Sequence, residues 1–100
     1  MIEIREYLDR AGRNLYKGWF ERLNAQAAAK VATSVTRLAL GNFSNVKGVG
    51  SGVCELRIDF GPAYRIYLDK DGDLLIILLG GGVKKRQQHD INAASVSWED

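Results

Sequence analysis

The chain has 100 residues, of which 46% are hydrophobic and 26% are charged, with a single proline. This composition is that of a globular protein and not of a disordered one, and the length suits one domain near the lower size limit for a self-sufficient core. A net charge of +2 is too small to indicate nucleic-acid binding by itself. One cysteine and one histidine cannot form an internal disulfide or a zinc site. We therefore expect one domain over residues 1–100, with no metal and no other cofactor.

The start of the chain and its longest apolar run bear on location. Residues 1–10 are charged throughout, which argues against a signal peptide. The apolar run at residues 74–79 is far too short to span a bilayer. We expect a cytoplasmic protein without a membrane partner.

The first half of the chain predicts one strand and two helices. Residues 2–5 alternate in polarity, as a short strand does. Residues 15–23 place aromatic and apolar side chains at helical spacing, which predicts an amphipathic helix. Asn24 can cap a second helix that ends at Gly41. The apolar stripe of this second helix is Ala27, Val31, Val35 and Leu38, and its outer side carries Lys30 and Arg37.

The second half predicts a loop, three strands and a last helix. Residues 41–52 form a glycine-rich loop, and strands are expected at residues 53–60, 64–68 and 74–79. Residues 74–79 are apolar on both faces, which predicts the central strand of an antiparallel meander. The glycines at 80–82 indicate a free turn before a helix at residues 84–94. The fold class is α+β: a short N-terminal strand, two helices, a three-stranded antiparallel meander and a C-terminal helix.

Two arginines stand at equivalent places in neighbouring predicted strands. Alternation puts Arg57 on the polar face of its strand, and it puts Arg65 and Tyr67 on the same side of the next one. We expect these side chains to share an open face. Guanidinium groups match phosphate oxygens, so such a face suits an RNA backbone. The alternative is a solvated polar face on which Arg57 pairs with Glu55 or Asp59.

Cations cluster again near the C-terminus. Lys84, Lys85 and Arg86 repel one another, and this repulsion favours a neutral lysine that can act as a base. His89 titrates near neutrality. The alternative is a solvated basic patch followed by a surface histidine.

The order of these motifs resembles one known family. The series comprises residues 38–43, Glu55-Leu56-Arg57, Gly61-Pro62, Tyr64-Arg65, Gly80-Gly81-Gly82 and residues 87–91. It is similar to the RelE/HigB-like toxins of bacterial type II toxin–antitoxin modules, in the branch of addiction module killer proteins. The similarity covers nearly the whole chain.

The resemblance implies a RelE/ParE-like toxin fold and a metal-independent, ribosome-associated mRNA endoribonuclease. It also implies a cognate antitoxin as partner, usually with a helix-turn-helix domain, so that the toxin meets DNA only through the antitoxin. In this chemistry the RNA 2′-OH attacks the adjacent phosphate, cations stabilise the developing charge, and an acid protonates the leaving 5′-oxygen.

The resemblance also implies roles for individual residues. The catalytic residues would be Arg57, Arg65, Lys84 and His89, and the RNA contacts would be Lys85, Arg86 and Tyr67. One alternative is a ParE-like toxin that poisons DNA gyrase by protein binding and cuts no RNA. A further alternative is a module that only forms regulatory complexes.

Overall fold

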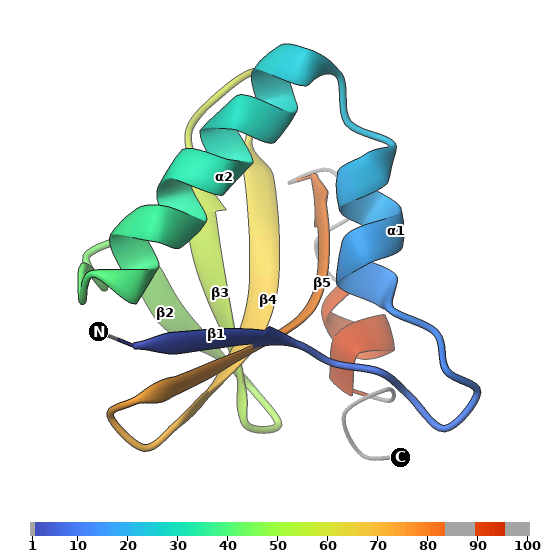
Figure 1. Cartoon of the computed structure of the whole chain (residues 1–100), viewed down its shortest axis with the longest axis vertical. Helices are drawn as coiled ribbons and strands as arrows, with labels where there is room; N and C mark the ends of the chain where they lie inside the picture. Colours follow the sequence, from blue (N-terminus) through green and yellow to red (C-terminus); the bar gives the residue numbers. More distant parts are fainter. Residues whose placement is uncertain (1, 84–89, 96–100) are drawn as a thin grey trace.

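A five-stranded mixed sheet organises this α+β protein (Figure 1), whose computed structural model describes residues 2–83 and 90–95. The strands are β1 (Glu3–Glu6), β2 (Val46–Gly50), β3 (Val53–Ile58), β4 (Tyr64–Asp71) and β5 (Leu75–Val83). Their order in the sheet is β1-β5-β4-β3-β2. β1 pairs with β5 in parallel, and the other neighbours are antiparallel.

The two N-terminal helices form where the sequence predicts them. α1 (Leu15–Glu21) follows an Asn14 cap, and α2 (Ala25–Ala39) follows the predicted Asn24 cap, whose side chain accepts a hydrogen bond from the Ala27 amide at 2.9 Å. Gly41 has φ +95°, and the Gly41 and Asn42 amides bond back to Leu38 and Arg37. This is the glycine-ended helix termination expected from the sequence.

α1 and α2 pack on one face of the sheet, which we call the apolar face. The core there joins Tyr16, Val31 and Leu38 of the helices to Leu56 and Ile66 of the strands, all of them buried. Alternation along β3 and β4 places these side chains as predicted, because successive strand residues point to opposite faces.

The predicted meander is confirmed as β3, β4 and β5, but the predicted three-stranded sheet is too small. β2 lies within the expected loop at residues 41–52 and forms a short edge strand that includes Gly48 and Gly50. β1 adds to the outer side of β5, so β4 is the central strand and the prediction for residues 74–79 is wrong. Sheet order depends on a parallel contact between distant segments, and no local pattern encodes it.

The predicted glycine turn at 80–82 is also wrong, because these glycines extend β5 to Val83. They pair with Tyr67, Ile66 and Arg65 of β4. A Cβ on Gly81 would overlap the Trp19 ring, and a Cβ on Gly82 would overlap the Asp90 carboxylate. Glycine therefore serves here to let neighbouring side chains approach a strand backbone closely.

The last helix of the described chain covers residues 90–95, inside and just beyond the range predicted for it. It lies beside β5 (Figure 1), and Ile91 and Ala94 pack on the face of the sheet opposite α2. Residues 84–89 of the predicted helix lie outside the described residues. Neither α1 nor α2, nor the helix at 90–95, has the length and apolar character needed to cross a membrane.

Candidate functional site on the polar face of the sheet

The face of the sheet opposite α1 and α2, which we call the polar face, carries charges in two cross-strand rows. In one row Lys47, Glu55 and Tyr67 lie opposite one another on β2, β3 and β4. In the next row Arg57 of β3 lies opposite Arg65 of β4. The two arginines are thus direct cross-strand neighbours, and the prediction that they share one face is confirmed.

Arg65 is buried in an ion pair with Glu55. Arg65 Nε lies 3.0 Å from Glu55 Oε1, and the side chains are only 6% and 1% exposed. The alignment at Nε is too poor for a hydrogen bond, while another guanidinium nitrogen of Arg65, Nη1, donates to the Tyr64 carbonyl at 3.2 Å. The pair neutralises two charges that would each be costly to bury alone.

Tyr67 is fully buried beside this pair. Within the described residues its hydroxyl has no hydrogen-bond partner. Burial raises the pKa of Tyr67 far above its usual range, the carboxylates of Asp90 and Glu55 raise it further, and Arg65 opposes them. The hydroxyl therefore stays protonated and cannot serve as a base near neutrality.

Of the two paired arginines, Arg57 is the one that reaches solvent. Its side chain is 52% exposed, and its Nε lies 3.6 Å from Asp59 Oδ1, an exposed pair of small energetic value. Arg57 also lines a hollow of about 110 Å³ with Lys47, Glu55 and Asn45. Two cations and a buried carboxylate thus meet at the β2–β3 edge of the polar face.

The expectation of an open face is wrong for Arg65 and Tyr67. The helix at 90–95 packs Ile91 and Ala94 into the same cluster as Tyr67, which covers this part of the sheet. The alternative of pairing is confirmed for Arg57, which meets Asp59, whereas Glu55 turns to Arg65 instead. Alternation gives the side of the sheet but does not say what covers that side.

Four of the residues assigned from the resemblance lie outside the described residues. They are Lys84, Lys85, Arg86 and His89. Their roles, and those of Arg57, Arg65 and Tyr67, stay predictions.

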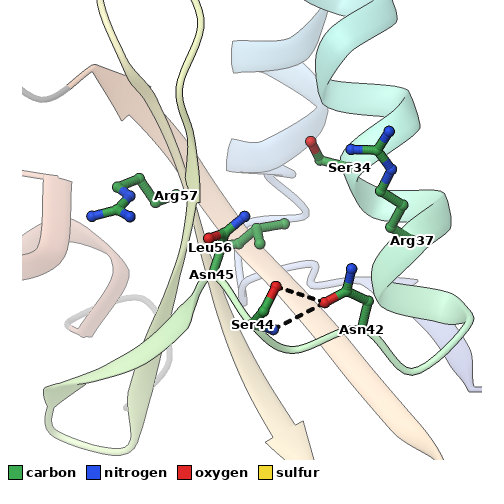
Figure 2. A pocket seen from close by; sticks show the side chains of 7 residues that line it. All are labelled: Ser34, Arg37, Asn42, Ser44, Asn45, Leu56 and Arg57. Carbon is green, nitrogen blue, oxygen red and sulfur yellow. Dashed lines mark hydrogen bonds between the residues drawn. The ribbon is translucent and has the colours of Figure 1, made fainter.

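A second group of polar residues lies across the sheet, on the α2 side (Figure 2). Ser34 and Arg37 of α2 face Asn42, Ser44 and Asn45 of the loop before β2. The Asn42 side-chain oxygen accepts hydrogen bonds from the Ser44 amide at 3.0 Å and the Ser44 hydroxyl at 2.8 Å. The Arg57 side chain extends away from this group, on the other side of its strand (Figure 2).

Sequence reasoning did not assign this second group to a site. Its available signal was the outer stripe of α2, where Lys30 and Arg37 lie seven positions apart. The loop residues gave no signal, because only the fold brings them against the helix.

Two other expectations concern cysteine and metal chemistry. Cys54 is partly buried and packs against the apolar core. Burial raises the pKa of its thiol, which disfavours the reactive thiolate. Over residues 2–83 and 90–95, His, Cys, Asp and Glu side chains form no group that could hold a metal ion.

Comparison with known proteins gives a family but no function. No family model matches the chain. An uncharacterized protein of Haemophilus influenzae (strain ATCC 51907 / DSM 11121 / KW20 / Rd) is 43% identical over 82 residues, which is 81% of this chain and 83% of the relative. The chain therefore belongs to the same family as that protein.

Proposed function

We propose that this member of the Haemophilus influenzae protein's family is the toxin of a type II toxin–antitoxin module. In this proposal it acts in the cytoplasm as a metal-independent, ribosome-associated mRNA endoribonuclease, and a cognate antitoxin silences it. The observation that carries the proposal is the exposed Arg57 directly opposite Arg65 on one face of the sheet. The motif resemblance adds the reaction.

The proposed reaction is an intramolecular transesterification of the RNA backbone. The 2′-oxygen bonds to the adjacent phosphorus as its proton passes to a base. The bond from phosphorus to the 5′-oxygen then breaks, leaving a cyclic phosphate, and an acid protonates the departing oxygen. Negative charge builds up on the phosphate oxygens, and the Arg57 guanidinium offers a fork of donors for two of them.

In this proposal Arg65 does not contact the RNA but holds the strands in place. Its guanidinium is held by Glu55 and is almost wholly shielded from solvent, so contact with RNA is left to Arg57 and Lys47 at the surface. Arg65 is therefore a positioning residue, which fixes β4 against β3 behind Arg57. The proposed acid and base, Lys84 and His89, rest on the sequence resemblance.

A cognate antitoxin is the proposed protein partner, with a helix-turn-helix domain that carries the contact with DNA. An acidic segment of the antitoxin would complement the exposed Arg57 and Lys47 at the β2–β3 edge. Charge complementarity of this kind acts mainly on the rate of encounter, so raised salt should slow association more than it speeds dissociation. An association rate that does not change with salt concentration would argue against binding of an acidic segment at this edge.

A second candidate is a ParE-like toxin that binds DNA gyrase and cuts no RNA. The burial of Arg65 and Tyr67 favours it, because two of the expected RNA-facing groups do not reach solvent. A protein-binding poison needs a surface and no buried catalytic group.

The deciding experiment is induced expression with 5′ ends of cellular mRNA mapped and plasmid supercoiling measured. New 5′-hydroxyl ends inside coding regions support the ribonuclease, whereas intact mRNA with altered supercoiling supports the gyrase poison. Arg57→Ala should lower cleavage by about 100-fold, yet change stability by less than about 1 kcal/mol. Lys17→Ala, which removes an exposed cation of α1, is the control. A folded Arg57→Ala protein that cuts mRNA at the wild-type rate would remove Arg57 from the site.

A further inference from the structure

We propose that the hollow between α2 and the end of β3 is a second phosphate-binding site. It would hold the sugar–phosphate backbone of a single-stranded RNA outside the scissile bond. As a statement about substrate, the inference rests on the proposed function. The site itself is argued from residues that the function has not used.

The outer face of α2 carries a continuous polar stripe. Lys30, Thr33, Ser34 and Arg37 occupy positions i, i+3, i+4 and i+7, which lie along one side of a helix. α2 contains no aspartate or glutamate, so no acid within the helix offsets the two cations. The stripe is therefore a row of positive charges and hydroxyl donors.

This stripe forms one wall of a hollow of about 300 Å³. The facing wall consists of Asn45, Arg57, Ile58, Asp59 and Phe60. Among the described residues that line the hollow, Asp59 is the one acid. Lys30 and Arg37 face it from the helix, while the Arg57 side chain extends to the other side of its strand. The charge of the hollow is thus positive.

The two cations of α2 are placed differently. Lys30 Nζ lies 5.4 Å from the centre of the Phe60 ring, which holds the ammonium group at the hollow without neutralising its charge. Arg37 makes no ion pair with any residue of the described chain. Its planar guanidinium group can therefore donate to phosphate oxygens.

The spacing favours a linear polyanion over one small anion. Seven helical positions separate Lys30 from Arg37, which is a rise of about 10 Å. Serine and threonine hydroxyls and the Asn45 amide lie between and opposite them as donors. A chain of phosphates can meet both cations at once.

The hollow also adjoins the proposed cleavage site. Arg57 lines the hollow on the α2 side and the smaller hollow on the polar face. Its amide bonds to the Asn45 carbonyl at 3.0 Å, so these two residues form the edge between the two hollows. An RNA strand bound at Arg57 would continue around this edge onto α2.

A purely structural role for Arg37 makes a different prediction. Arg37 lies in the last turn of α2, where a cation is favoured by the helix dipole. Loss of that interaction would lower thermal stability. It would not change how RNA affinity depends on salt.

The test is a salt titration of RNA binding by the full chain, using a 2′-O-methyl single-stranded RNA that cannot be cleaved. Lys30→Ala/Arg37→Ala should lower the slope of log affinity against log salt by about 1.4, the value for two lost contacts with a single strand. Lys70→Ala/Lys17→Ala is the matched control, because it removes two exposed cations, one of which lies over Phe43 just as Lys30 lies over Phe60. Lys30→Gln/Arg37→Gln gives a second variant if the alanine pair folds poorly.

We call Lys30→Ala/Arg37→Ala the cleft pair and Lys70→Ala/Lys17→Ala the control pair. Equal slopes of log affinity against log salt for these two double variants would overturn the inference. Cleavage of unmodified RNA, measured separately, distinguishes this failure from failure of the proposed function. If the protein cuts RNA and the slopes are equal, the second site fails alone. If the slope falls only in the cleft pair and no RNA is cut, the second site stands and the ribonuclease proposal fails.

Discussion

The two faces of the sheet bury their side chains by different means. On the apolar face, Ile66 and Leu56 belong to one hydrophobic cluster with residues of α1 and α2. On the polar face, Glu55 and Arg65 are just as inaccessible, but their burial depends on an ion pair at 3.0 Å. A polar residue that alternation places on the side of the sheet opposite the apolar core can therefore still be buried. A buried charged side chain needs a partner of opposite charge, whereas a buried apolar side chain does not.

The largest expected effect comes from breaking the buried pair. Arg65→Met removes the cation that lies 3.0 Å from the buried Glu55 carboxylate, so the free energy of unfolding should fall by about 3–5 kcal/mol. Denaturant unfolding monitored by circular dichroism measures it. The double variant Glu55→Gln/Arg65→Met removes both charges and should recover most of the loss. If the double variant were as unstable as Arg65→Met alone, the unpaired charge would not be the cause of the lost stability.

The glycines of β5 allow the two faces to be compared at adjacent positions. Gly81→Ala would force a methyl group into the Trp19 ring on the apolar face, at a cost of about 1–3 kcal/mol. Gly82→Ala should cost less, because the Asp90 carboxylate that it meets is the end of a flexible side chain. Gly48→Ala on β2, with no atom near the added methyl group, is the control and should change stability by about 0.5 kcal/mol or less. Equal losses at positions 81 and 82 would contradict this difference between faces.

Alkaline pH should lower the stability of the protein, because each face of the sheet buries a tyrosine. Burial raises the pKa of Tyr16 from 10.0 to about 12, with a smaller contribution from Glu6, and burial also raises the pKa of Tyr67. The unfolded chain therefore releases these protons at lower pH than the folded one. Stability from Tyr16 should be complete below pH 10 and should be lost as pH rises toward about 12. Denaturant midpoints measured between pH 10 and about 12 should fall less steeply with pH for Tyr16→Phe than for the wild type. An identical dependence on pH in the two proteins would count against the raised pKa of Tyr16.

The smallest effect is expected at the Tyr67 hydroxyl. Since this group has no hydrogen-bond partner within the described residues, Tyr67→Phe removes an uncompensated polar atom. Stability should stay within about 1 kcal/mol of the wild type, or rise. If Tyr67→Phe instead lost several kcal/mol in denaturant unfolding, the hydroxyl would have to be part of a polar network on this face.

The helices and the meander were predictable because their determinants are local. The Asn24 cap, the Gly41 terminus and the alternation in β3 and β4 each depend on residues only a few positions apart. Local geometry and side-chain polarity suffice to decide such features. The same alternation placed Arg57 and Arg65 on one face.

The remaining features were decided by contacts between distant segments. β1 joins β5 in parallel, β2 forms from a glycine-rich stretch, and Gly81 stays extended because Trp19 packs on it. The helix at 90–95 covers Tyr67, and Glu55 has Arg65 rather than a neighbour on its own strand as its ion-pair partner. The sequence by itself determined which residues lie on each side of the sheet. Only the tertiary structure decided which of them reach solvent, because burial depends on what packs against a face, and that partner lies elsewhere in the chain.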